Sequence, residues 1–182
     1  MPGAALVLGG AECVWSDIAE ARRIGRPAGV VGCNHIGIAF PHPMDAWCSL
    51  HPDEFGAWSA QRTARGLPAH RELYGQSGAA YASKAVQVTL TDMGFTGGTV
   101  NGTSSLFACK VALVDLGFDR VVLCGAPMED GPHFNGPHGL PHVERHKPAW
   151  IAAAPLLRDR VRSMGGWTRE LLGEPTVDWF RG

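Results

Sequence analysis

Residues 106–125 read LFACKVALVDLGFDRVVLCG, and this stretch decides the fold. Its first part, residues 106–116, is apolar apart from Lys110 and Asp115, and an apolar run of this length predicts a buried helix. Gly117 then suits the C-terminal end of a helix. Residues 121–125 are apolar with no polar side, which predicts a strand buried on both faces of a parallel sheet.

Similar units occur nearer the N-terminus. Short apolar runs at residues 4–8, 29–33 and 45–50 predict strands, and residues 13–24 and 53–66 predict helices. Strands that alternate with helices form a parallel sheet covered by helices on both faces. We therefore expect an α/β fold, specifically a Rossmann-like three-layer sandwich with a mainly parallel sheet.

The rest of the chain gives weaker signals. Residues 85–90 alternate between apolar and polar side chains and predict an edge strand, whereas residues 75–84 are expected to form a loop. Residues 126–148 are rich in proline, glycine and histidine, which predicts a long loop. Residues 151–172 suggest two helical pieces. We expect one domain, with a core at residues 1–150 and a helical tail at residues 151–182 packed on it.

Composition excludes several classes of partner. The chain of 182 residues has 16 Lys plus Arg and 17 Asp plus Glu, so its net charge of -1 attracts neither nucleic acid nor an anionic membrane. No segment approaches the roughly 18 apolar residues of a membrane-spanning helix. The five cysteines form no CxxC motif, which favours free thiols and a cytoplasmic location. Trp167 and Trp179 in the tail suit either a homo-oligomer contact or closure of the core.

Candidate binding residues follow the predicted strands, because ligands of parallel sheets bind beyond the carboxyl ends of the strands. Glycine lets backbone N–H groups approach an anion, asparagine can bind a base or ribose, and histidine can bind phosphate or transfer a proton. Ordinary turns would explain the same residues equally well. The candidates at these strand ends are Gly9, Gly10, Asn34, His51 and Gly125.

A second candidate anion site precedes the helix predicted at residues 106–116. Thr103, Ser104 and Ser105 can cap this helix, and their hydroxyls, together with the free N–H groups of the first turn, can hold a phosphate or carboxylate. The alternative is a helix cap with no ligand.

The loop at residues 126–148 carries four histidines: His133, His138, His142 and His146. His142 and His146 have the i,i+4 spacing of metal-binding helices, but they match neither HExxH nor HxxEH, and nearby prolines disfavour a helix. We therefore expect no metal site from them, and instead a histidine that acts as general base over the crevice. Glu129 and Asp130 either coordinate Mg²⁺ carried by a diphosphate or are solvated loop charges.

The segment at residues 103–125 resembles a signature shared by two related groups of proteins. These are the bacterial sialyltransferases that use CMP-sialic acid and the 6-hydroxymethylpterin diphosphokinase-like proteins. In both, a Ser/Thr-containing helix start precedes an apolar helix, a glycine-aromatic turn and a strand that ends in glycine. The resemblance implies His133 or His138 as catalytic base. It also implies nucleotide contacts at Gly9, Gly10, Asn34, Thr103, Ser104 and Ser105.

This chain departs from that signature at several positions. The Gly-Pro-Ser that follows the first strand in those groups is absent, Ser105 replaces a glycine, and Pro127 replaces an acidic residue. The resemblance implies a nucleotide-dependent transferase that moves a sugar or a diphosphoryl group, with Mg²⁺ or without metal. The departures favour an alternative, a module that binds or senses a nucleotide without chemistry. Hydrolysis of a nucleotide or an N-glycoside is a third hypothesis. In each, the partner is a small phosphorylated or nucleotide ligand.

Overall fold

The computed structural model describes residues 3–77, 86–95, 102–137 and 142–181. These residues form a seven-stranded sheet in the order β5-β4-β3-β2-β1-β6-β7, and every neighbouring pair is parallel. The strands are β1 (Ala4–Leu8), β2 (Gly29–Cys33), β3 (Ala46–Ser49), β4 (Glu72–Gln76), β5 (Thr89–Thr91), β6 (Arg120–Cys124) and β7 (Val161–Ser163).

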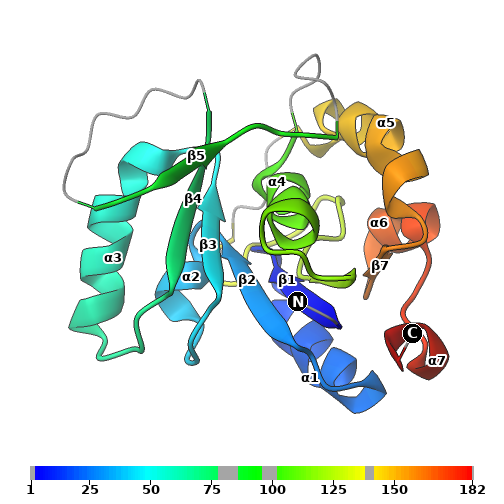
Figure 1. The fold of residues 1–182 in the computed structure, drawn as a ribbon, viewed down its shortest axis with the longest axis horizontal. Helices are drawn as coiled ribbons and strands as arrows, with labels where there is room; N and C mark the ends of the chain where they lie inside the picture. The colour runs from blue at the N-terminus through cyan, green and yellow to red at the C-terminus, as the bar shows by residue number, and fades with distance from the viewer. Residues whose placement is uncertain (1–2, 78–85, 96–101, 138–141, 182) are drawn as a thin grey trace.

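Helices cover both faces of this sheet, so the predicted three-layer α/β sandwich is confirmed (Figure 1). One face carries α1 (Val14–Ile24), α2 (Ile36–Ala39), α3 (Phe55–Ala64) and α7 (Val177–Arg181). The other carries α4 (Ser104–Lys110), α5 (Lys147–Leu157) and α6 (Gly166–Leu172). Shorter helical segments are η1 (Pro52–Glu54), η2 (Val111–Asp115), which continues α4 in π-helical form, and η3 (Val143–Arg145).

The central strand β1 shows why continuous apolar runs form this sheet. Ala5 and Val7 belong to the core cluster beneath α4 and α5, whereas Leu6 and Leu8 belong to the cluster beneath α1. All five residues of β1 are buried. A polar side chain at any of them would lose water without a partner, so both faces of the strand must be apolar.

Two strands were not predicted. Strand β7 lies where helix was expected, so that part of the tail prediction was wrong, and β4 includes Gly75 and Gln76 from the expected loop. Strand β7 has only three residues and pairs with β6, and β4, whose sequence ELYGQ has no continuous apolar run, pairs with β3 and β5. An edge strand is present as predicted, but β5 covers only Thr89 and Leu90 of the predicted residues 85–90, residues 86–88 are not strand, and residues 78–85 lie outside the described residues.

The tail closes the core. Trp167 packs against one core cluster, and Trp179 packs against the other. Across the described ranges, none of the helices combines the length and the apolar character that crossing a membrane would need.

A buried arginine fixes α3 against the segment that contains α2. Arg62 is 2% exposed, and its guanidinium group donates hydrogen bonds to four backbone carbonyl oxygens. The acceptors are those of Gly37 (2.6 Å), Phe40 (2.8 Å), His42 (2.9 Å) and Pro68 (2.6 Å). This network sets the position of the chain that follows β2, which also contributes to the candidate site.

We expect Arg62→Leu to lower the free energy of unfolding by about 3 kcal/mol, because buried carbonyl groups lose charged donors. Urea denaturation followed by circular dichroism measures the change. Arg65→Leu, at an exposed position just after α3, should change the free energy by less than about 0.5 kcal/mol. Equal effects of the two substitutions would contradict a structural role for Arg62.

Candidate functional site

A cavity of about 610 Å³ opens at the carboxyl ends of β1, β2, β3 and β6. This is where the strand order reverses at β1, and such positions bind ligands in open parallel sheets. The cavity brings together every predicted site residue in the described part of the chain. Those residues are Gly9, Gly10, Asn34, His51, Thr103, Ser104, Ser105, Gly125 and His133. His138 lies outside the described residues.

The floor of the cavity is made of backbone from the loops that follow β1 and β6. Ala11 N donates to Gly125 O at 3.0 Å, and a Cβ at Gly9 would overlap the same carbonyl group. Gly125 has a φ of +68°, a conformation that side chains disfavour, and its N–H donates to Asp17 Oδ2 at 2.8 Å. Two glycines are therefore needed for the close approach of these loops.

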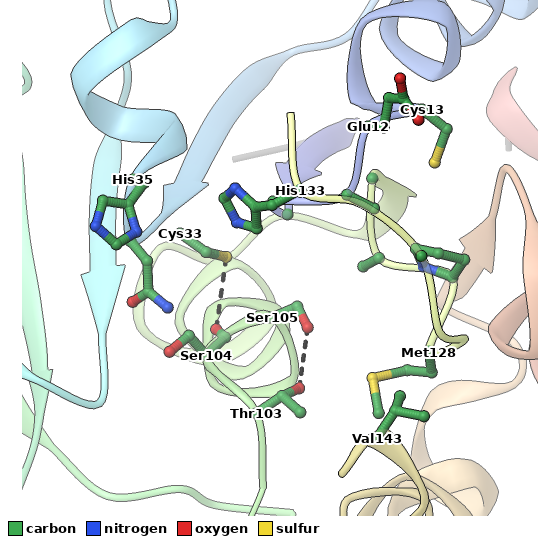
Figure 2. A pocket seen from close by; sticks show the side chains of 18 of the residues that line it. Glu12, Cys13, Cys33, His35, Thr103, Ser104, Ser105, Met128, His133 and Val143 are labelled. Carbon is green, nitrogen blue, oxygen red and sulfur yellow. Dashed lines mark hydrogen bonds between the residues drawn. The ribbon is translucent and has the colours of Figure 1, made fainter. Parts of the chain in front are cut away.

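The hydroxyl groups before α4 have distinct roles. Thr103 is the N-cap, because its Oγ1 accepts hydrogen bonds from Leu106 N and from Trp150 Nε1, both at 3.2 Å. An oxygen that accepts two bonds directs its own proton elsewhere, here to Ser105 Oγ at 2.9 Å (Figure 2). Ser105 then keeps its own O–H as a donor. Thr103 thus positions the helix start, and Ser104 and Ser105 present hydroxyls at the cavity.

Asn34 turns the chain at the end of β2. Its φ of 49° is left-handed, and its side-chain oxygen accepts a hydrogen bond from Ser49 Oγ at 2.8 Å. Ser49 Oγ in turn accepts from the backbone N–H of His51 at 2.9 Å. Because the Asn34 oxygen is engaged in this way, its amide NH₂ is the group available to a ligand.

His133 is held over the β1 loop by backbone pairing. It forms a bridge with Ala11, and the neighbouring Phe134 N donates to Gly10 O at 2.9 Å. His133 Nδ1 donates to the side-chain oxygen of Asn135, which leaves Nε2 with its lone pair. Gly10 makes room for the ring, since a Cβ there would overlap Nε2.

Burial lowers the pKa of His133, and the nearby His35 lowers it further, although the bond to Asn135 acts in the opposite direction. The imidazole is therefore neutral at pH 7, as a general base must be. The thiols in the cavity are unsuited to attack as nucleophiles. Burial raises the pKa of Cys13 to about 12 and raises that of Cys33, so both remain protonated.

His35, Glu12 and Trp58 also line the cavity, although sequence reasoning did not select them. The signal for His35 was present, because it follows Asn34 directly at the end of a predicted strand. Its ring lies 6.0 Å from that of His133, centroid to centroid, and 5.2 Å from that of Trp58. Nothing local in the sequence indicates these contacts.

The lining is acidic. Glu12, Glu129 and Asp130 contribute carboxylates, and none of the described lining residues is Lys or Arg. Carboxylate oxygens suit Mg²⁺ rather than softer metals. In the described ranges, no group of three or more His, Cys, Asp or Glu residues is arranged to hold a metal ion. Of the loop histidines in those ranges, only His133 lines the cavity.

Comparison of the chain with protein-family models, with curated proteins and with solved structures gives no significant match. The resemblance of residues 103–125 to the sialyltransferase and diphosphokinase-like groups therefore stays a prediction.

We expect Gly10→Ala to raise the pKa of His133 toward the ordinary histidine value of about 6.5, because the new Cβ displaces the ring toward water. NMR titration of the imidazole measures it. Gly165→Ala is the matched control, since a Cβ there meets nothing within 4 Å and the backbone is extended. A His133 pKa equal to that of the wild type in Gly10→Ala would refute this packing.

Proposed function

We propose that the protein is a nucleotide-dependent transferase that moves a glycosyl or diphosphoryl group to an acceptor hydroxyl. One observation carries the proposal. One cavity, at the point where the strand order reverses, is lined by residues that are distant in sequence. These are the strand-end glycines, the helix start at Ser104 and Ser105, and the neutral histidine His133. Such a cavity suits a phosphorylated ligand with a reacting group near a base.

The donor phosphates would lie between the loop at Gly9 and Gly10 and the hydroxyls of Ser104 and Ser105. Backbone N–H groups and hydroxyls there would stabilise the negative charge that develops on the leaving phosphate. The carboxylates of Glu129 or Asp130 would hold Mg²⁺ if the nucleotide brings it. A divalent ion would offset the acidic lining and the charge of the phosphates.

The acceptor hydroxyl would give its proton to Nε2 of His133 while its oxygen bonds to the transferred carbon or phosphorus atom. The bond from that atom to the nucleotide's phosphate oxygen breaks, and its electron pair leaves on that oxygen. His133 suits this role because Asn135 fixes its tautomer and burial keeps it neutral.

The cysteines support the proposed cytoplasmic location. All five are free, and four of them are buried among apolar side chains. Free thiols persist in reducing compartments.

A thermal-shift screen against nucleotides and nucleotide sugars, with and without Mg²⁺, tests the ligand class. A ligand at 100 times its Kd adds about 2.7 kcal/mol to the free energy of unfolding, which raises the Tm by about 5–10 °C for a chain of this size. Ser104→Glu should reduce the shift, because its carboxylate would repel the phosphates. The absence of a shift with every nucleotide would contradict the proposal.

His133→Asn should lower kcat by about 10²–10⁴-fold and leave donor binding unchanged. Asparagine can keep the hydrogen bond to Asn135 but has no equivalent of Nε2. In the wild type, activity should fall on acidification with an apparent pKa below 6.5, because the lowered pKa keeps the base neutral to lower pH.

His42→Asn is the control, since His42 is exposed and does not line the cavity. Turnover in His133→Asn equal to that of His42→Asn would show that His133 is not the base. Donor binding with no turnover in the wild type would favour a module that binds a nucleotide without chemistry.

A further inference from the structure

Two histidines from separate loops meet in the cavity. His35 follows β2 and His133 follows β6, and their rings contact edge to face at an interplanar angle of 87° (Figure 2). The base proposed above uses only one of them. His35 is exposed, whereas His133 is half-buried, so the two imidazoles occupy different environments at one site.

The residues around His35 fix its position. The left-handed turn at Asn34 is anchored by Ser49, and α2 begins one residue after His35. The ring packs at 5.2 Å against Trp58, which stacks on the buried Trp47 at 6.0 Å and 17°. A side chain of a loose surface loop would not have a rigid aromatic support of this kind.

The charges of the cavity lining limit which side chains can attract an anion. Among the described lining residues, only the imidazoles of His35, His51 and His133 can carry a positive charge. The other titratable groups there are the carboxylates of Glu12, Glu129 and Asp130 and the thiols of Cys13 and Cys33. Within the described lining, the side-chain cations available to an anionic leaving group are therefore the histidines.

We propose that His35 is a second catalytic residue, whose imidazolium form binds the phosphate that leaves while His133 deprotonates the acceptor. This inference rests on the proposed function. In the reaction, His133 Nε2 takes one proton from the acceptor hydroxyl, and His35 gives one proton to the phosphate oxygen that receives the electron pair of the broken bond. Exchange of one proton with water at each ring restores the starting state.

The contact between the rings of His35 and His133 affects the protonation of His133. Burial is the main cause that lowers the pKa of His133, and a positive charge on His35 lowers it further. Like charges at this distance repel, so the geometry disfavours a state in which both rings are protonated. A histidine with a lowered pKa beside a second imidazole places a base and a proton donor at one site.

Binding of inorganic sulfate tests the anion role, since sulfate has the charge of a phosphate dianion and does not titrate between pH 6 and 8. Calorimetry should show that the wild type binds sulfate at least about tenfold more tightly at pH 6 than at pH 8. Deprotonation of the imidazoles at higher pH removes charged hydrogen-bond donors. His35→Gln should weaken sulfate binding at pH 6 about tenfold and reduce its pH dependence, to which His51 and His133 would still contribute. His42→Gln should behave like the wild type.

NMR titration gives a second readout that needs no ligand. His35→Gln should raise the pKa of His133, because it removes a neighbouring positive charge. Sulfate affinity and a His133 pKa that both match the wild type in this variant would overturn the role of His35. If nucleotides bind and turn over normally in His35→Gln, this inference fails and the proposed transferase stands. If sulfate binding depends on His35 but no nucleotide binds, the transferase fails and the anion site stands.

Discussion

The parallel pairing of β1 with β6 sets the geometry of the site. The two strands pair along their whole length, from Ala4 opposite Arg120 to Leu8 opposite Cys124, so they end at the same level. The loops that follow them therefore meet backbone to backbone, at Gly9 and Gly125. Strands β2 to β5 extend the sheet on one side of β1, and β6 and β7 extend it on the other. A crevice opens where the strand order reverses, because the connections that follow the two adjacent strands leave the sheet in opposite directions.

The small residues at this crevice make room for larger ones from distant segments. Gly10 leaves space that the ring of His133 fills, and the backbone around it pairs with the histidine loop through Ala11 and Phe134. A loop rich in proline is thus fixed over the sheet by a few backbone hydrogen bonds. Its position determines which of its side chains line the cavity, and it brings the imidazole of His133 next to His35 at the end of β2.

The described cavity lining contains histidines but no arginine, and this difference has a chemical consequence. A guanidinium group holds a phosphate at any physiological pH, but it cannot take up or release a proton. An imidazole attracts an anion as a cation only when it is protonated, and in that form it can also donate a proton. In an acidic lining formed by Glu12, Glu129 and Asp130, the proposed binding of an anion would depend on pH and on any divalent cation that accompanies it.

Much of this protein could be predicted from local patterns. The buried strands β1, β2, β3 and β6 are continuous apolar runs that end in glycine or a polar residue, and α1 has a clear apolar stripe. Since parallel strands end at a common edge, these endings also indicated where a ligand site would form. Strand β4 escaped prediction because its sequence, ELYGQ, has no continuous apolar run, and β7 because it has only three residues; both depend on pairing with a neighbour.

The fold class and many residues at the carboxyl edge thus follow from the sequence alone, because burial on both faces demands apolar runs and their ends must turn. The arrangement of those residues follows only from the packing of the chain. The cap formed by Thr103, the neutral state of His133 and its contact with His35 all depend on burial and on distances between segments far apart in the chain. Such properties arise from packing, which no local pattern of residues encodes.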